Sequence, residues 1–529
     1  MSPSRGSVAA RLGNVPRIYL AGLAIVTLIG SALRVRAVFY PLRHDEAYTF
    51  LTYGLQPVWT TLSTYESPAN HILHSVLVRL ACLALGNQEW AVRMPALAAG
   101  ILVIPASFAV FAILADYGAA LLAAALVACS HELIAFSANA RGYSQASLLM
   151  LLMIIAAAQL GTRRSAAAWA LQVACAVAAL YTVPSMLYAV VMVWTWMALE
   201  AGREQQRGLR YLDIAIAGAA VVALTALLYL PPIMRSGWDA LFRNKFVAPL
   251  DWPNFISAFP GSVAATWFDW HRNLPAAMGW ALSLGFAAFV IGAAVLRRRR
   301  ALFGLLVSAV AGIGVVVLLQ RVAPPSRVWL FLLPVFMGMA ASGLSSLVEL
   351  RGGAGWDEGR SPGPARTILP TLATVVIVLL CVWMALPLAG GDPFLADNEA
   401  RDLPAIADYL RSELRPGDAV LAAPPLEEPL KYYFYRWHLP PKYVNAEPAI
   451  GGRCFVVLDA RYLPQRNTAV GQIFFDDHER ARLVLLKKWN VGAVYQLTTA
   501  AALRRTVLSA PNGTGSVAAA SQNEDEIRK

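Results

Sequence analysis

The sequence contains little charge for its length. Of its 529 residues only 14% are Asp, Glu, Lys or Arg, whereas 58% are hydrophobic and the mean hydropathy is +0.53. This composition excludes an ordinary soluble protein and predicts a polytopic membrane protein. The formal net charge of +12 does not indicate nucleic-acid binding, because the arginines form short clusters between apolar runs, as expected of loops retained in the cytoplasm.

Cysteine is also scarce. Four of the five cysteines, Cys82, Cys129, Cys175 and Cys381, fall in apolar stretches, and Cys454 stands alone in a more polar region. This distribution predicts neither a disulfide framework nor a thiolate metal site. No glycine-rich phosphate loop opens a helix in the C-terminal part, so the sequence predicts no nucleotide cofactor there.

Apolar runs dominate the first 390 residues. The first, 18–33, follows an arginine-bearing N-terminus and lacks a small-residue cleavage site before Arg34, which predicts an uncleaved anchor. With it, the later runs predict about eleven membrane-spanning helices of roughly 20 residues each. The later runs lie near 92–114, 116–136, 144–161, 166–182, 184–200, 212–232, 275–296, 301–320, 327–347 and 368–389.

A cytoplasmic N-terminus places every arginine-rich loop inside, as the positive-inside rule requires. The transmembrane domain, 1–390, then has outer loops 38–91 and 233–274, and short apolar stretches in loop 38–91 predict helices lying along the interface. Everything after residue 390 is also predicted to be outside. The sequence there predicts an extracytoplasmic α/β domain over 391–510 and a disordered tail over 511–529. In this domain, helices at 403–414, 427–437 and 478–489 are expected to alternate with the strands AVLAA, CFVVLD and GAVYQL.

Two adjacent carboxylates, Asp45 and Glu46, follow the first apolar run in the stretch PLRHDEAYTF. They fit the first turn of an interfacial helix, since Asp caps helices and Glu suits a first turn. They also fit catalysis, because more polar groups gather on the same predicted face: Glu66, Asn70, His71, Arg141, Tyr143, Arg321 and Arg327. A carboxylate that deprotonates a hydroxyl and arginines that bind a phosphate would then converge outside the membrane.

Four ordered motifs resemble a known group of enzymes. They are HDEAYTF at 44–50, ANHILHSVLVRLACLALGNQEWAVRMPALAAG at 69–100, SHELIAFSANARGYS at 130–144 and APPSRVWLFLLP at 323–334. Over about 15–350 the chain resembles the GT-C fold membrane glycosyltransferases, the superfamily of the protein O-mannosyltransferases, the lipid A aminoarabinose transferases and the RgtA-B-C-D-like transferases. The resemblance implies a polytopic α-helical GT-C membrane protein with a small C-terminal extracytoplasmic α/β domain, located in the bacterial inner membrane.

The resemblance also implies an activity: inverting transfer of a hexosyl or pentosyl group from a polyprenyl-phosphate carrier to a hydroxyl of a lipid, polysaccharide or protein acceptor. The catalytic carboxylate maps onto Asp45, with Glu46 as its motif partner. Arg327, Arg141 and Arg321 are the candidates to hold the phosphate, since a guanidinium binds phosphate bidentately. For Arg327 a flanking anchor is an equally simple interpretation, and for Arg141 a contact that caps the start of a helix is the simpler one.

The first outer loop departs from one pattern of the resembled enzymes. Lipid A transferases carry Glu-Lys-Pro-Pro near a bound metal, whereas this chain reads Glu66-Ser67-Pro68-Ala69, so neither metal use nor acceptor identity carries over. Glu66 and His71 remain candidate ligands of a divalent metal ion, and His71 fits a hydrogen-bonded structural histidine as well. Asn70, Tyr143 and Trp270 are candidate substrate contacts, although Trp270 also fits an interfacial tryptophan belt.

Two other classes of function fit parts of the sequence. A transporter or flippase of lipid-linked sugars would carry ionisable residues or broken helices near the bilayer midplane, where this sequence is nearly free of charge. A membrane scaffold with a binding module in its C-terminal domain would tolerate replacement of Asp45. The collection of polar groups on one predicted face favours an enzyme.

Overall fold

The computed structural model describes residues 8–202, 210–242, 248–272, 274–295, 299–351, 365–390, 398, 400–446, 449, 452–459, 483–490 and 492–497. The chain forms two compact units, which we treat separately. Unit 1 comprises Met1–Tyr40 and Thr49–Phe394, and unit 2 comprises Pro41–Tyr48 and Leu395–Lys529. The expected tail, 511–529, lies outside the described residues.

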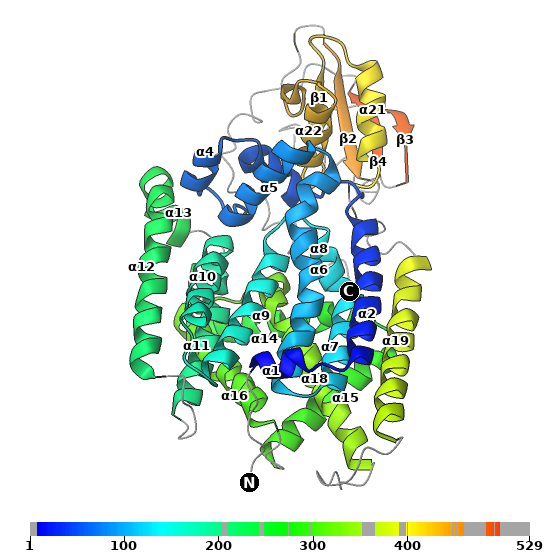
Figure 1. The fold of residues 1–529 in the computed structure, drawn as a ribbon. Coiled ribbons are helices and arrows are strands. Elements are labelled where there is room, and N and C mark those ends of the chain that lie inside the picture. The colour runs from blue at the N-terminus through cyan, green and yellow to red at the C-terminus, as the bar shows by residue number, and fades with distance from the viewer. Residues whose placement is uncertain are drawn as a thin grey trace. The chain divides into compact units, whose positions relative to one another are not determined.

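Unit 1 is a bundle of helices (Figure 1). Its elements are α1 (Val8–Gly13), α2 (Arg17–Ala37), η1 (Phe50–Gly54), α4 (Val58–Ser63), α5 (Ile72–Leu85), α6 (Glu89–Leu114), α7 (Tyr117–Cys129), α8 (His131–Ser137), α9 (Tyr143–Leu160), α10 (Ala166–Thr182), η2 (Pro184–Met186), α11 (Leu187–Ala201), α12 (Tyr211–Ser236), α13 (Trp238–Phe242), α14 (Trp252–His271), α15 (Ala276–Ala294), α16 (Arg300–Ser308), η3 (Ala309–Ile313), α17 (Gly314–Gln320), η4 (Ser326–Leu332), α18 (Leu333–Arg351) and α19 (Ala365–Gly390).

In the described part of the chain, nine helices are long and apolar enough to cross a membrane, or ten if α7 and α8, which meet at a bend of 61°, form one span. The sequence predicted about eleven membrane-spanning helices. The additional run, 166–182, is helix α10, whose 17 residues make it a shorter apolar helix. The chain is therefore a polytopic helical membrane protein, as its composition predicts.

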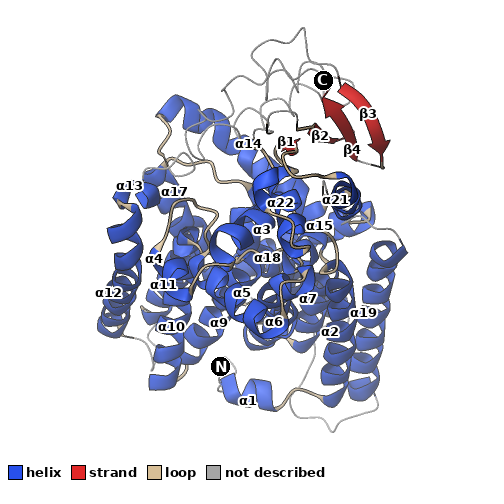
Figure 2. Cartoon of the chain, turned by 90° about the horizontal axis from the view of Figure 1, so that it is seen from above, coloured by secondary structure: helices blue, strands red, loops and turns tan. Residues whose placement is uncertain are grey.

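Alanine-rich α7 lies in the core of unit 1. Its alanines are all 0% exposed, at positions 119, 120, 123, 124, 125 and 128. It packs against α2, α6, α18 and α19, and α2 and α19 lie side by side (Figure 1 and Figure 2). Because apolar burial drives little association between helices in lipid, such small side chains are what allow close packing of helices.

Arg34 is fully buried in the last turn of α2. Its Nη1 donates to the carbonyl oxygens of Gly30 and Ala128 at 2.9 Å each, and its Nη2 donates to that of Val127 at 3.0 Å. Val127 and Ala128 lie in the last turn of α7, where carbonyl groups lack intrahelical partners and the helix dipole favours a cation. Arg34 thus caps α7 where the chain bends into α8.

We expect Arg34→Met to destabilise the protein by about 1–3 kcal/mol for each of the two α7 carbonyls left without a donor. Thermal unfolding of the purified protein in detergent measures this effect. Leu28→Met on the same helix is the matched control, because Leu28 is 71% exposed and should tolerate the change. Equal midpoints for Arg34→Met and wild type would show that the cap contributes nothing to stability.

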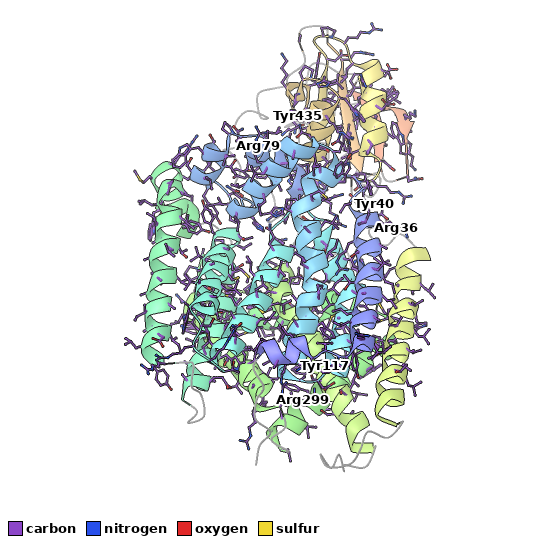
Figure 3. All side chains as sticks on the ribbon, viewed as in Figure 1. Arg36, Tyr40, Arg79, Tyr117, Arg299 and Tyr435 are labelled. Atoms are coloured by element: carbon purple, nitrogen blue, oxygen red, sulfur yellow. The ribbon has the colours of Figure 1, made fainter. Side chains whose placement is uncertain are left out.

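The two ends of the bundle have different polar contacts. Arg36 and Tyr40 lie at one end, and Tyr117 and Arg299 lie at the opposite end (Figure 3). At the second end, Asp116 caps α7 by accepting from the N–H of Ala119 at 2.8 Å, and its other carboxylate oxygen accepts from Nη2 of Arg299 at 2.6 Å. Helices α4 and α5 lie across the first end (Figure 1).

The predicted outer loop 233–274 is largely helical. Helix α12 extends to Ser236, and α13 and α14 follow. Helix α14 exposes Ile256, Val263 and Phe268 to 66%, 51% and 74%. Its start is attached to the turn before η4, because the N–H of Leu250 donates to the carbonyl oxygen of Arg321 at 3.0 Å. The exposed apolar face suits a helix at the edge of a lipid layer.

Unit 2 contains α21 (Leu403–Glu413), β1 (Ala419–Ala422), α22 (Glu427–Arg436), η5 (Pro441–Tyr443), β2 (Cys454–Asp459), β3 (Leu483–Lys488) and β4 (Gly492–Leu497). The strands form one mixed sheet in the order β1-β2-β4-β3, shown together in Figure 2. Strand β1 pairs parallel to β2, with Val420 opposite Phe455, and β4 pairs antiparallel to both β2 and β3. Strand β2 is a central strand and is buried throughout, and the edge strand β1 is buried as well.

One element of unit 2 differs from the expectation. The helix predicted over 478–489 is wrong for its described part, because Leu483–Lys488 form the edge strand β3. Pairing with β4 determines the outcome, since LVLLKK has only weak local preference and gains ladder hydrogen bonds along β4. The exposed lysines Lys487 and Lys488 on this edge oppose pairing with another chain.

Candidate active site

Asp45 and Glu46 lie in the first turn of α3 (His44–Thr49). Glu46 is 0% exposed, and its Oε2 accepts a hydrogen bond from the backbone N–H of Arg43 at 3.0 Å. This is the reciprocal bond of a capping box, in which an acid in the first turn satisfies a donor at the helix start. Asp45 is exposed. The structure therefore gives Glu46 a capping contact and exposes Asp45 at the start of the same helix.

Helix α3 crosses the boundary between the two units. Its residues up to Tyr48 belong to unit 2, and Thr49 belongs to unit 1. The Thr49 hydroxyl donates to the carbonyl oxygen of Ala69 at 3.4 Å, within the loop that precedes α5. Asp45 precedes Thr49 by about one turn of α-helix.

The chain between α2 and α3 is bonded by Arg93 of α6. Nη1 of Arg93 donates to the carbonyl oxygen of Val38 at 3.0 Å and also to that of Tyr40.

Asn70 fixes the loop at the start of α5. Its Nδ2 donates to the carbonyl oxygen of Thr64 at 2.7 Å, and its Oδ1 accepts from the hydroxyl of Ser75 at 2.8 Å. Asn70 is only 1% exposed, so both ends of the amide are used in the interior. Asn70, a predicted substrate contact, therefore makes structural hydrogen bonds, which hold the residue that precedes His71.

His71 meets the turn that starts α9. Its Nδ1 lies 2.8 Å from the backbone nitrogen of Gly142, and its Nε2 lies 3.2 Å from Nη2 of Arg141. The imidazole is 2% exposed and the Arg141 side chain is 6% exposed. Its ring also contacts Tyr143 edge-on, with centroids 4.9 Å apart. Residues separated by about 70 positions in the sequence are therefore brought into one buried cluster.

Both ring nitrogens of His71 face N–H donors. A neutral imidazole has one lone pair and one N–H, whichever tautomer it adopts. One of the two contacts must therefore join two donors. The backbone amide of Gly142 is fixed by the turn, so the unfavourable contact falls on Nη2 of Arg141. An anionic oxygen placed beside both groups would accept from the guanidinium and from the ring N–H.

The surroundings of His71 also disfavour a positive charge on its ring. Burial lowers the pKa of His71 well below its usual range, and the charges of Arg141 and Arg327 lower it further. The ring is therefore neutral at neutral pH, and Arg327, whose side chain is exposed, lies within electrostatic reach of it. Burial likewise raises the pKa of Tyr65 to about 12, with Arg141 acting in the opposite direction. Two guanidinium groups and neutral partners create a site of positive potential.

Three residues outside the predicted set belong to this cluster. Nδ1 of His74 lies 2.9 Å from Oε1 of Gln145, both of them buried, and Tyr65 carries the phenol that Arg141 influences. His74 follows His71 by three positions and Gln145 follows Arg141 by four, so helical spacing was the available signal. Nothing in the sequence indicated Tyr65 as a member of the cluster except its position next to Glu66.

Gly142 allows the close approach of the α9 turn to His71. A Cβ atom at this position would lie 2.3 Å from Cγ2 of Thr182 and 3.2 Å from Nδ1 of His71. We expect Gly142→Ala to destabilise the protein by about 1–3 kcal/mol, as overpacking does, measured by thermal unfolding in detergent. Gly314→Ala is the control, because nothing lies within 4 Å of a Cβ there. Equal midpoints of thermal unfolding for Gly142→Ala and Gly314→Ala would contradict the close packing at Gly142.

The remaining predicted residues lie elsewhere. Glu66 is exposed. Arg321 has its guanidinium over the ring of Trp252, 5.7 Å from the centroid. Trp270 packs against Phe336 with centroids 5.6 Å apart. These contacts favour structural roles for Arg321 and Trp270, whereas Asn70, His71, Arg141 and Tyr143 come together, with Arg327 in electrostatic range.

The cluster does not suit a metal ion. Within the described ranges, no three or more His, Cys, Asp or Glu side chains are grouped so that they could hold one. Both nitrogens of His71 face N–H groups, and a guanidinium at 3.2 Å disfavours a second cation. The predicted pair of metal ligands, Glu66 and His71, therefore does not fit, and no step below uses a metal.

No protein-family model and no curated protein matches the sequence. Solved structures do match its fold. ArnT from Cupriavidus metallidurans in the apo state is 12% identical, with a TM-score of 0.58 over 89% of this chain and 97% of that one. The same protein bound to undecaprenyl phosphate gives 0.54 at 12% identity over 90% and 97%. The apo oligosaccharyltransferase of Archaeoglobus fulgidus gives 0.50 at 12% identity over 90% and 74%.

At this level of identity the likeness concerns the fold. The fold places the chain among multi-pass helical membrane proteins with a small C-terminal part that contains a sheet. Within that class the chain has the GT-C fold, which it shares with ArnT and with the archaeal oligosaccharyltransferase.

Proposed function

We propose that this protein is an inverting glycosyltransferase that moves a sugar from a polyprenyl-phosphate carrier to a hydroxyl group of an extracytoplasmic lipid, polysaccharide or protein acceptor. Support comes from the fold, since ArnT of the same fold has been solved bound to undecaprenyl phosphate. Fold alone does not determine function, so the argument depends on the site.

The observation that carries the proposal is the pair formed by His71 and Arg141. Two donors face each other 3.2 Å apart in a buried cluster, and a phosphate oxygen would accept from both. Arg327 adds a second guanidinium in electrostatic range of His71. A monoester or diester phosphate has several oxygens in the right arrangement for more than one such donor. The cluster therefore suits the phosphate of a lipid carrier.

Asp45 is the proposed general base. It would take the proton of the acceptor hydroxyl as the acceptor oxygen forms its bond to the anomeric carbon of the sugar. The bond from that carbon to the carrier phosphate breaks, and its electron pair leaves with the polyprenyl phosphate. Arg141 and Arg327 stabilise the charge that develops on the leaving phosphate. Attack opposite to the leaving group inverts the configuration of the sugar.

The same proposal assigns a location. His71 directly precedes α5, and α4 and α5 lie across the end of the bundle where Arg36 and Tyr40 lie (Figure 1 and Figure 3). We assign this end to the extracytoplasmic face of the bacterial inner membrane. The domain after residue 390 is assigned to the same face, because the arginine-rich loops between spans suit the cytoplasm.

The test uses the purified protein in sealed proteoliposomes with polyprenyl-phosphate donors carrying a labelled hexose or pentose and with cell-envelope acceptors. We expect the label to enter acid-stable glycan in step with the release of free polyprenyl phosphate. Movement of intact labelled donor across the bilayer, without cleavage, would replace the proposal with the transporter alternative.

A further inference from the structure

The turn between α17 and η4, residues 321–325, leads directly to Arg327, the second residue of η4. Helix η4 packs against α9, which begins directly after Arg141 and Gly142, and also against α14 and α18. Because η4 is a 3₁₀-helix, whose hydrogen bonds have poorer geometry than those of an α-helix, it gives little rigidity of its own. The position of Arg327 therefore depends on what holds the turn.

Arg321 opens the turn in a strained backbone conformation. Its φ is 49°, in the left-handed region that residues other than glycine rarely adopt. Its N–H donates to the carbonyl oxygen of Val317 at 2.7 Å, and its carbonyl oxygen accepts from the N–H of Leu250 at 3.0 Å. Its guanidinium lies over the ring of Trp252, 5.7 Å from the centroid. Such a conformation persists only where the surroundings hold it.

Helix α14 contacts the turn at two places. Leu250 and Trp252, at the start of α14, hold Arg321. Ser262, about three helical turns further along α14, donates its hydroxyl hydrogen bond to the carbonyl oxygen of Pro324. The turn is therefore bonded to α14 at its first residue and again near its last.

Tyr188 of α11 joins the chain before the turn to the chain after it. Its hydroxyl donates to Oε1 of Gln320 at 2.6 Å, and its ring packs against Trp329 with centroids 4.9 Å apart. Tyr188 is 4% exposed and Trp329 is 8% exposed, so this contact is part of the packed interior. Gln320 directly precedes the turn, and Trp329 follows Arg327 by two positions.

We propose that Tyr188 and Ser262 are positioning residues, which hold the turn 321–325 and thereby place Arg327 to bind the carrier phosphate. This inference rests on the proposed function, because it takes Arg327 as a phosphate ligand. An arginine side chain has many rotamers, and a mobile backbone beneath it would add further positions that binding must remove. A backbone fixed before the carrier arrives reduces that entropic cost.

The first experiment compares Tyr188→Phe with wild type. The variant loses only the hydroxyl bond to Gln320 and keeps the ring against Trp329, so it should fold. Hydrogen–deuterium exchange of peptides covering 320–329 should increase. Undecaprenyl phosphate, titrated into the purified protein in nanodiscs, should bind roughly 3- to 10-fold more weakly, the range set by one neutral hydrogen bond. Ser262→Ala should change both measurements in the same direction.

The second experiment separates positioning of Arg327 from a general loosening of the bundle. In an Arg327→Gln background, Tyr188→Phe should change the affinity for undecaprenyl phosphate by less than roughly twofold, because the group that it positions is already gone. Tyr117→Phe is the matched control. The Tyr117 hydroxyl donates to the carbonyl oxygen of Arg11 at 2.8 Å, at the end of the bundle opposite Arg36 and Tyr40 (Figure 3). Its loss should leave carrier affinity at the wild-type value.

The outcomes distinguish this inference from the proposed function. Unchanged exchange over 320–329 in both Tyr188→Phe and Ser262→Ala would show that neither side chain holds the turn. Carrier binding at the wild-type affinity in both variants, or an equal loss with and without Arg327, would overturn the positioning role while the proposed function stands. A wild-type protein that binds no undecaprenyl phosphate would refute the proposed function itself, and the positioning role with it.

Discussion

Replacement of Asp45 by asparagine is expected to lower kcat for sugar transfer roughly 10²- to 10⁴-fold, the usual contribution of a general base. The amide is nearly isosteric with the carboxylate but cannot accept the acceptor's proton. Because Asp45 is exposed in the first turn of α3, the change should leave folding intact. Transfer of labelled sugar by equal amounts of purified wild type and Asp45→Asn measures the effect.

The control for this prediction is Asp213→Asn. Asp213 lies in the first turn of α12, and its partly exposed ion pair with Arg164 at 3.9 Å contributes little. Thermal unfolding of both variants should match wild type. Transfer by Asp45→Asn at the wild-type rate would remove Asp45 from the mechanism and move attention to Glu66 or to a function without catalysis.

Replacement of Arg141 by lysine is expected to weaken binding of undecaprenyl phosphate roughly 10- to 100-fold, the cost of about one to two charge-assisted hydrogen bonds. Lysine keeps the charge but cannot present two parallel donors, and its shorter head would not reach the place of Nη2 beside His71. Titration of the carrier phosphate into protein in nanodiscs, with tryptophan fluorescence or calorimetry as readout, measures the dissociation constant.

Arg164→Lys is the control for charge conservation, because the Arg164 side chain is 52% exposed and its ion pair with Asp213 is long, at 3.9 Å. It should bind the carrier as wild type does. His71→Ala provides an independent check: it removes the donor that faces Arg141, so carrier binding should weaken without loss of the guanidinium. Equal affinity of wild type and Arg141→Lys would show that the phosphate binds elsewhere and would leave the His71 cluster a structural feature of the bundle.

The sequence predicted the parts of this protein that depend on local hydrophobicity. Each of the eleven apolar runs is helical in the structure, because a span needs only a continuous apolar stretch to satisfy its backbone within the helix. The strands AVLA, CFVVLD and GAVYQL were found for the same reason. The stretch 483–488 was misassigned, since its strand depends on a partner that local pattern does not reveal.

The candidate site was predictable in residue types but not in arrangement. The sequence named Asp45, His71 and Arg141 from polar residues in an apolar chain and from motif resemblance. It did not show that Glu46 caps its own helix, or that Arg321 lies over Trp252 instead of in the His71 cluster. These contacts depend on side-chain directions after folding, and residue spacing in a loop does not determine them.

Composition and apolar length by themselves determined that this is a polytopic helical membrane protein with a separate α/β region, because transfer of apolar residues from water to lipid acts on each segment independently. Only the tertiary structure decided which polar groups meet. It placed the Gly142 amide and Arg141 on opposite nitrogens of His71 and joined Asn398 to the carbonyl oxygen of Pro41. Such contacts join residues distant in the chain, and their energies depend on burial and geometry that exist only after the helices pack.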